Sequence, residues 1–159
     1  MRKYYTLYGR LLSEKLLTQA FRKVKAAKGA PGIDGQSVKA FASELAENIT
    51  LLVRELQEKS YCPLPVKRVE IPKPDGGTRK LGIPAVRDRV VQQALLDILQ
   101  PIFDPDFHPS SYGYRPGKSC HHAISKATLF IRKYEREWVV DMDLSKCFDT
   151  LDHGIILDS

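Results

Sequence analysis

The stretch that constrains the architecture of this chain most is WVVDMDLSKCFD, residues 138–149. Apolar and acidic side chains alternate over residues 138–144, a period that predicts a β-strand with Asp141 and Asp143 on one face. Neighbouring carboxylates repel one another unless water, a base or a cation compensates their charge. A divalent cation is the usual compensation at a phosphoryl-transfer site. The spacing alone is equally compatible with two solvated aspartates near a sheet edge.

The charge of the chain is unevenly distributed. Its 159 residues include 25 Lys/Arg and 19 Asp/Glu, a formal net charge of +6. Residues 1–133 hold 23 of the basic and 12 of the acidic side chains, whereas residues 134–159 hold 2 and 7. A basic body followed by an acidic end suits a protein that grips a phosphate backbone and holds a metal at one end. Many basic proteins bind no nucleic acid, so composition leaves this open.

The cysteines indicate a reducing compartment. Cys62, Cys120 and Cys147 lie far apart and form no C-x-x-C pair, which argues against a zinc ribbon or a disulfide scaffold. The N-terminus lacks an uninterrupted apolar segment, and no later run approaches the ~20 apolar residues of a membrane span. We therefore expect a cytoplasmic protein that has no contact with a membrane.

Helical periodicity dominates the first third of the chain. Residues 11–28 are expected to form one amphipathic helix, whose polar face carries Lys23 and Lys25 among other basic side chains. Such a face is either simply solvated or a contact for RNA. Residues 29–35, GAPGIDG, end this helix in a loop, and Ser37 is expected to cap a second helix over residues 38–59.

A basic β-hairpin is predicted next. The strands are expected over residues 66–72 and 78–84, joined by a turn at residues 74–77 in which glycine supplies positive φ. Lys73 and Arg79 are the right residue types for phosphate contact, although charges on a hairpin also keep its edges soluble.

Two further helices are predicted after the hairpin. One spans residues 86–103 and is kinked or ended by Pro101, and the other runs from a Ser119 cap to about Tyr134. Between them, Tyr112, Tyr114 and Arg115 either stack on a base or sugar or brace their own glycine-containing loop. The final residues stop in mid-pattern, so we expect the acidic strand to belong to a larger sheet.

Several of these segments occur together in one order. The blocks at residues 71–84, 87–92, 112–117 and 141–153 closely resemble the bacterial reverse transcriptases encoded by group II introns, and residues 29–35 match the N-terminal extension of the same family. Their sequences are IPKPDGGTRKLGIP, RDRVVQ, YGYRPG and DMDLSKCFDTLDH. The resemblance runs from about residue 11 to the end.

This resemblance implies an α+β fold. It would comprise helix-rich reverse transcriptase fingers with a short antiparallel β-hairpin, and it would end in the first strand of the palm. Residues 1–36 would be an N-terminal extension of helix and loop, residues 37–135 the fingers, and residues 136–159 the start of the palm.

The resemblance also implies residue roles. Asp143 falls on the first catalytic aspartate, which binds metal with the help of the Leu144 carbonyl. Lys73 and Arg79 fall on the pair that clamps the nucleotide triphosphate, and Phe148 falls on the residue that packs under the sugar. Asp141 matches no catalytic position. The side chains expected at the template or the intron RNA are Lys23, Lys25, Gly32, Ile33 and Arg115.

The implied activity is RNA-templated DNA synthesis with two Mg²⁺ ions. Its partners would be intron RNA, an RNA template with a DNA primer, and dNTPs. In the family the other two catalytic carboxylates lie in a later Tyr-Ala-Asp-Asp hairpin that residues 1–159 do not contain, so we expect these residues alone to be inactive. An exposed palm strand would also favour self-association.

Three alternatives remain at the level of sequence. The chain could be a non-catalytic RNA-binding module whose aspartates are relics. It could also come from a reverse transcriptase adopted for CRISPR spacer acquisition or for repair. A self-contained metal nuclease is disfavoured, because Asp149 and Asp152 lie on a turn beyond the strand.

Overall fold

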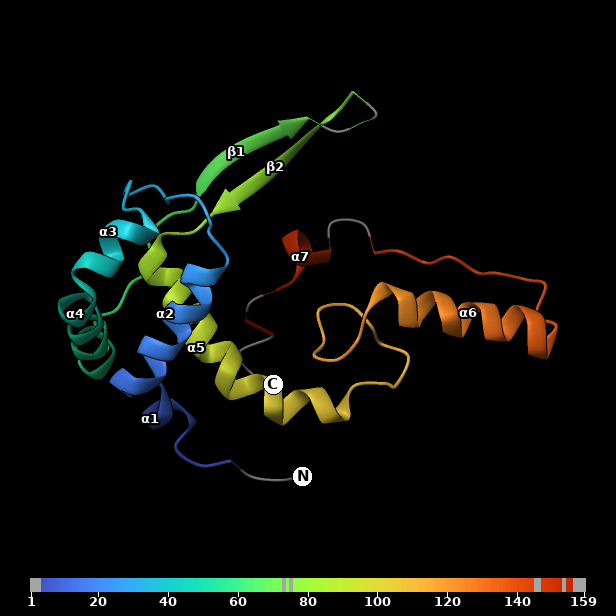
Figure 1. Cartoon of the computed structure of the whole chain (residues 1–159), viewed down its shortest axis with the longest axis horizontal. Helices are drawn as coiled ribbons and strands as arrows, with labels where there is room; N and C mark the ends of the chain where they lie inside the picture. The colour runs from blue at the N-terminus through green and yellow to red at the C-terminus, as the bar shows by residue number, and fades with distance from the viewer. Residues whose placement is uncertain (1–3, 73, 75, 145–146, 153, 156–159) are drawn as a thin grey trace. The chain divides into compact units, whose positions relative to one another are not determined.

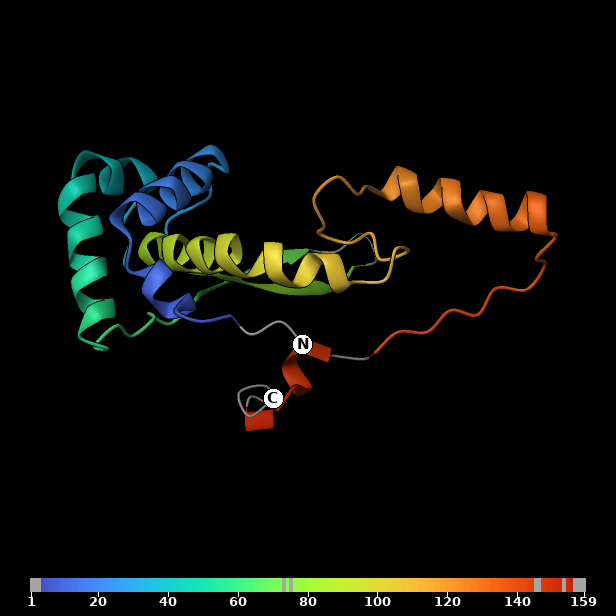
Figure 2. The same ribbon diagram turned by 90° about the horizontal axis from the view of Figure 1, so that it is seen from below.

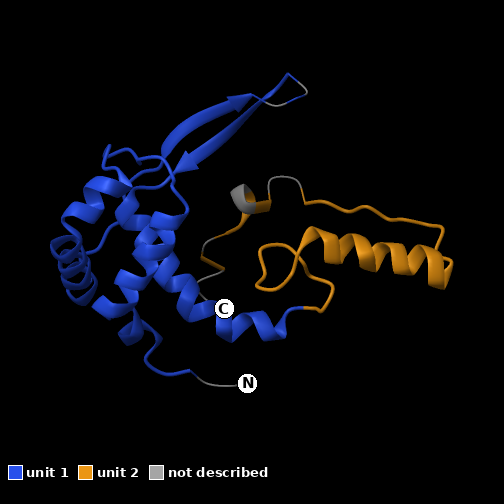
Figure 3. Cartoon of the chain, viewed as in Figure 1, with its two compact units in different colours: residues 1–107 blue, residues 108–159 orange. Residues whose placement is uncertain are grey.

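A computed structural model describes residues 4–72, 74, 76–144, 147–152 and 154–155. The chain divides into two compact units, residues 1–107 and residues 108–159 (Figure 3). The domains predicted from the family resemblance have their boundaries after residues 36 and 135. The division into two compact units does not test those boundaries, which stay a prediction.

Serine caps set the helix boundaries in the first half of unit 1. The predicted helix over residues 11–28 is instead two helices, because the Ser13 hydroxyl accepts a hydrogen bond from the Leu16 amide (3.4 Å) and begins a new helix there. Ser37 caps the next helix as predicted, by accepting from the Ala40 amide (3.1 Å). This helix does not continue to residue 59, since Glu44 leaves helical geometry with φ −119° and ψ 35°. The four helices are α1 (Leu7–Leu11), α2 (Glu14–Ala26), α3 (Val38–Ser43) and α4 (Leu45–Gln57).

The predicted hairpin is confirmed. Strands β1 (Lys67–Pro72) and β2 (Thr78–Ile83) pair antiparallel, with Val69 opposite Leu81 (Figure 1). Gly76 in the turn adopts φ 84°, the left-handed conformation for which glycine was expected there. Nearly all residues of both strands are exposed, so the hairpin projects from the helices.

Helix α5 (Val86–Phe103) has the bounds that periodicity predicted. Pro101 lies inside it and does not end it. Because Pro101 is in the last turn, its missing N–H removes only one hydrogen bond of the ladder. A short 3₁₀ helix, η1 (Asp104–Asp106), follows directly.

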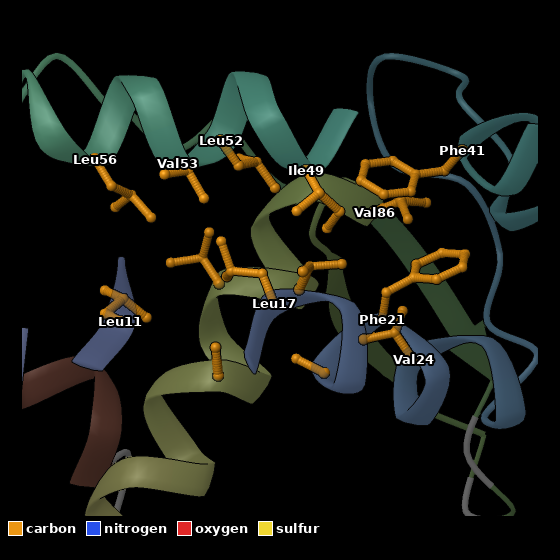
Figure 4. Close-up of a cluster of buried hydrophobic side chains, with 14 of the residues drawn as sticks. Leu11, Leu17, Phe21, Val24, Phe41, Ile49, Leu52, Val53, Leu56 and Val86 are labelled. Atoms are coloured by element: carbon orange, nitrogen blue, oxygen red, sulfur yellow. The ribbon is translucent and has the colours of Figure 1, made fainter. Parts of the chain in front are cut away.

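The core of unit 1 is built around α5. Helix α2 lies alongside α5 in both views (Figures 1 and 2), while α4 packs on α2 and α3 contacts both α4 and α5. Apolar side chains from α4 point towards those of α1 and α2 in Figure 4. The rings of Phe21 and Phe41 stack with centroids 5.1 Å apart. The buried side chains include Leu11, Leu17, Phe21, Phe41, Ile49, Leu52, Leu56, Val86, Val90 and Ile98.

Unit 2 contains one long helix. Helix α6 (Cys120–Tyr134) begins where predicted, with the Ser119 hydroxyl accepting from the His122 amide (3.3 Å). The short helix α7 spans Cys147–Thr150. None of the residues that the structure describes in unit 2 is buried, and the apolar side chains of Phe130, Ile131 and Tyr134 on α6 are exposed.

The strand predicted at residues 138–144 is not formed. Residues 135–144 have no regular secondary structure, because a strand requires a neighbour for its N–H and C=O groups and no described residue pairs with this segment. Its apolar side chains are correspondingly exposed, with Trp138 at 93% and Met142 at 87%. The architecture remains α+β through the hairpin of unit 1.

None of the helices among the described residues is both long enough and apolar enough to traverse a lipid bilayer.

Candidate nucleotide and nucleic-acid site

Arg79 is presented by the hairpin. It is the second residue of β2, lies opposite Ile71 beside the turn, and is exposed. Its guanidinium has no hydrogen-bond or ion-pair partner among the described residues, so its donors are available for a phosphate. Lys73, the other cation expected to clamp the triphosphate, lies outside the described residues.

A buried carboxylate holds the base of this hairpin. Asp88, only 1% exposed, accepts hydrogen bonds from the Tyr61 hydroxyl (2.7 Å) and the Leu64 amide (3.0 Å). Burial, together with the hydrogen bond to Asp88, raises the pKa of Tyr61 above its ordinary range. The segment leading into β1 is therefore attached to the first turn of α5.

Arg87, the residue before Asp88, belongs to the same network of contacts. Its guanidinium hydrogen-bonds to the carboxylate of Glu55 on α4 and lies 5.3 Å above the ring centroid of Tyr61. The arginine compensates part of the negative charge of the two carboxylates in a partly buried setting, where an isolated ion would be costly.

The loop at residues 29–35 packs against the start of α5. Gly32 is buried, and a Cβ at this position would lie 2.5 Å from the Ala85 Cα. Arg89 donates from Nη2 to the Ala30 carbonyl (2.7 Å). Ile33, by contrast, is 54% exposed. The loop thus presents the large apolar side chain of Ile33 to solvent while its backbone contacts the helix.

The two lysines expected to bind RNA differ in their surroundings. Lys23 forms an ion pair with Asp97 of α5 (Nζ to Oδ1, 2.7 Å), so its charge is already compensated. Lys25 has no partner among the described residues. With Lys28 and Lys39 it lines a cavity of about 480 Å³ beside Gly29 at the start of the loop. Lys25 is therefore available to a polyanion without breaking an ion pair, whereas Lys23 is not.

Arg115 braces its own loop in unit 2. Its Nη1 donates to the carbonyls of His108 (3.0 Å) and Ser111 (3.1 Å). Lys118 lies 5.5 Å from the centroid of the Tyr112 ring in the same loop. These contacts favour the bracing interpretation of Arg115, and its contact with a template stays a prediction.

Asp143 and Leu144 lie in the segment before α7. Both are exposed, and the Leu144 carbonyl accepts a hydrogen bond from the Cys147 amide (3.3 Å). Carboxylate and carbonyl oxygens are the donors that hard divalent cations take, but such ions take about six ligands. No group of three or more His, Cys, Asp or Glu suited to a metal occurs within the described part of the chain. The donors fit a divalent cation in kind and fall short in number. The side chain of Phe148 lies outside the described residues.

The sequence predicted no role for three consecutive residues of α5. Arg87, Asp88 and Arg89 attach α4, the approach to β1 and the glycine loop to one helical turn. The sequence carried no clear signal for Asp88, because at helical spacing it lies away from the apolar stripe that includes Val86, Val90 and Ala94. Their partners lie 24 to 59 residues away along the chain, so the contacts could not be read from spacing.

Comparison with known families gives one match. Residues 71–159 match the model of the family described as reverse transcriptase (RNA-dependent DNA polymerase). The matched region begins in β1 and includes Arg79, residues 87–89 of α5 and Asp143.

Comparison with individual proteins gives several relatives. Protein YkfC of Escherichia coli is 43% identical over 146 residues, which cover 89% of this chain and 38% of that protein. Group II intron-encoded protein LtrA of Lactococcus lactis is 34% identical over 154 residues, which cover 95% of this chain and 25% of that protein. Nuclear intron maturase 1, mitochondrial, of Arabidopsis thaliana is 33% identical over 75 residues, or 47% of this chain and 10% of that protein. The chain thus spans well under half the length of these relatives.

Proposed function

The chain belongs to the reverse transcriptase family, in the group encoded by group II introns, and from this premise we propose that it supplies the nucleotide-binding hairpin and the first metal-binding aspartate for RNA-directed DNA synthesis. The observation that carries the proposal is that the family match includes both Arg79 and Asp143. Intron RNA, an RNA template with a DNA primer, and dNTPs are the proposed partners. The unpaired state of Cys62, Cys120 and Cys147 supports work in the cytosol.

Arg79 binds the triphosphate in this proposal. The side chain stands next to the hairpin turn, without an intramolecular partner among the described residues, and a guanidinium can donate two parallel hydrogen bonds to phosphate oxygens. Positive charge placed there stabilises the negative charge that develops on the transferring phosphates. Lys73 adds a second cation at the turn, and Phe148 packs under the sugar.

Asp143 and the Leu144 carbonyl hold divalent metal in this proposal. We infer Mg²⁺ as the ion, with two ions in the complete site, because carboxylate and carbonyl oxygens suit it. Bound there, the metal would activate the attacking primer oxygen and neutralise the leaving pyrophosphate. Since residues 1–159 contribute one of the required carboxylates, they are inactive as a polymerase when taken alone.

Two assays test the nucleotide site and the inactivity together. Binding of a labelled dNTP to the chain on an RNA–DNA primer-template is measured with Mg²⁺ present, for Arg79→Gln and for the matched control Lys80→Gln. Lys80 is the next residue of β2 and points to the other face, opposite Glu70. Loss of the bidentate contact should weaken binding about tenfold for Arg79→Gln and little for Lys80→Gln.

Each of the two assays has an outcome that would contradict the proposal. Equal effects of the two substitutions would contradict the proposed role of Arg79. Primer extension by the same chain is expected to stay at background, and clear nucleotide incorporation would overturn the proposed inactivity.

RNA binding independent of catalysis is a second candidate function. It is favoured by Lys25, Lys28 and Lys39, which line one cavity and have no acidic partner among the described residues. Uncompensated cations that neutralise RNA phosphates release counterions, so affinity should fall steeply with salt.

Salt dependence tests this function. Each lysine is changed singly to Gln, with Lys15→Gln as the control from an exposed position of α2. Each cavity substitution should reduce the slope of log K against log salt by about 0.7 to 0.9, and the control should not. A slope that no substitution alters would exclude this cavity as a phosphate contact.

A further inference from the structure

The first turn of α5 receives three chain segments that are far apart in the sequence. Asp88 holds Tyr61 and Leu64, Arg87 holds Glu55, and Arg89 holds Ala30. The turn also follows β2 directly, through Pro84 and Ala85. The start of the hairpin, its end and the glycine loop are therefore all attached to the first turn of α5.

The loop at residues 29–35 packs closely against this turn. A Cβ on Gly29 would lie 2.2 Å from Nη1 of Arg89, and a Cβ on Gly32 would lie 2.7 Å from the Ala85 nitrogen. At Gly32 the contact is with backbone, so the chain itself would have to shift, whereas at Gly29 the flexible end of the Arg89 side chain would have to move. The two glycines thus allow the loop backbone to approach Arg89 on one side and Ala85 on the other.

Arg89 is better suited to this role than lysine would be. Its Nη2 donates to the Ala30 carbonyl while its Nη1 contacts Gly29, so the planar fork covers two successive residues of the loop. A lysine ammonium is a point charge and cannot reproduce that planar contact. A hydrogen bond from a charged donor is also stronger than a neutral one.

We propose that Arg89 is a positioning residue that keeps the loop docked on α5 in the absence of nucleic acid. Docking holds the exposed Ile33 in a constant relation to the hairpin that carries Arg79. In this proposal the loop stays next to the hairpin whether or not a template is bound. The docking itself is independent of the proposed function, and only its use in placing a template rests on that function.

Loss of Arg89 should loosen the loop more than it destabilises the unit. Nε of Arg89 is buried without a hydrogen-bond partner in the structure, which is unfavourable. Substitution by Gln removes this unfavourable group together with the bond to Ala30. We therefore expect local opening of the loop with a small change in global stability.

Amide hydrogen exchange of the chain without nucleic acid tests the proposal. Arg89→Gln should accelerate exchange about tenfold or more at Gly35 and Gln36, whose amides bond within the loop to the Gly32 carbonyl and Asp34. Exchange at Tyr61 and Leu64 should stay as in the parent. Arg89→Lys should show an intermediate acceleration.

Arg87→Gln is the matched control on the same turn. It should accelerate exchange at Tyr61 and Leu64 and leave the loop protected, because Arg87 contacts Glu55 and the Tyr61 ring. Gly32→Ala provides a second route, since it should undock the loop while Arg89 stays intact.

Three results would overturn the proposal. These are an unchanged loop in Arg89→Gln, equal acceleration of both segments by the two arginine variants, and a parent loop that becomes protected only when a primer-template is added. Failure of the chain to bind RNA would count against the proposed function and would leave these exchange results interpretable.

Discussion

The Tyr61 hydroxyl donates a 2.7 Å hydrogen bond to Oδ1 of Asp88, a carboxylate that is buried in the first turn of α5. The other carboxylate oxygen accepts from the Leu64 amide, and Nε of Arg87 lies 3.7 Å from Oδ1. The buried charge is thus compensated on three sides. A pair separated by 27 residues joins the approach to β1 to the helix that follows β2.

Tyr61→Phe should lower the free energy of unfolding by about 1–3 kcal/mol, because it leaves a buried carboxylate oxygen with one partner fewer. Urea unfolding of the parent and the variant measures this difference. Tyr5→Phe is the control, since Tyr5 is 76% exposed and should change stability by less than about 0.5 kcal/mol. Equal effects of the two substitutions would mean that the hydrogen bond contributes nothing measurable.

The same tyrosine should make stability depend on alkaline pH. Burial and the bond to Asp88 raise the pKa of Tyr61 in the folded state above its ordinary value of 10.0. Above about pH 10 the unfolded chain loses the phenolic proton while the folded chain keeps it, so the free energy of unfolding falls as pH rises.

Unfolding titrations at about pH 8.5 and about pH 10.5 check this sign. The stability difference between the parent and Tyr61→Phe should shrink at the higher pH, because the variant lacks this titration. A difference that stays constant or grows would contradict the raised pKa.

Ser13→Ala should destabilise unit 1 by about 0.5–2 kcal/mol, because the Leu16 amide at the start of α2 loses its acceptor. Ser13→Asp keeps an acceptor and should restore most of the loss. Thermal unfolding followed by circular dichroism measures both. If alanine and aspartate behave alike, the cap does not set the boundary between α1 and α2.

Elements that depend on interactions between residues close in sequence were predicted most accurately. Helix α5 and the hairpin depend on local periodicity and turn residues, and both were predicted with nearly correct bounds. The boundary at Ser13 was missed although Ser13 and Glu14 are favourable at a helix start, because Leu12 and Leu16 continue the apolar period across it. Periodicity alone does not show where a capped helix begins.

The candidate site was predictable only in part. Residue types singled out Arg79 and Lys25, and the structure leaves both side chains available. The spacing of residues along the sequence does not reveal contacts between distant segments. Lys23 pairs with Asp97 across 74 residues, and Arg89 contacts Ala30 across 59. The strand predicted at residues 138–144 shows the opposite situation. Its alternating sequence favours a strand, but no described strand pairs with it, and it is not formed.

Asp97→Asn should increase the affinity of the chain for RNA by releasing Lys23. The ion pair joins a half-exposed lysine to a carboxylate that is 14% exposed and also accepts a hydrogen bond from Gln93 (2.8 Å). Removing the carboxylate frees one cation of α2, so the slope of log K against log salt should steepen by about one. The cost in stability should stay below about 1 kcal/mol, because the lysine of the pair is half-exposed to solvent.

A double-mutant cycle decides whether Lys23 is the released cation. In the parent, Lys23→Gln should change RNA affinity little, since Asp97 already compensates the charge. In the Asp97→Asn background, the same substitution should abolish the gain in affinity and return the salt slope to its original value. If Lys23→Gln weakens binding equally in both backgrounds, the ion pair opens when RNA binds and Lys23 belongs with Lys25 as a direct contact. If it changes neither, the gain arises from net charge alone and the face formed by α2 and α5 is not where RNA binds.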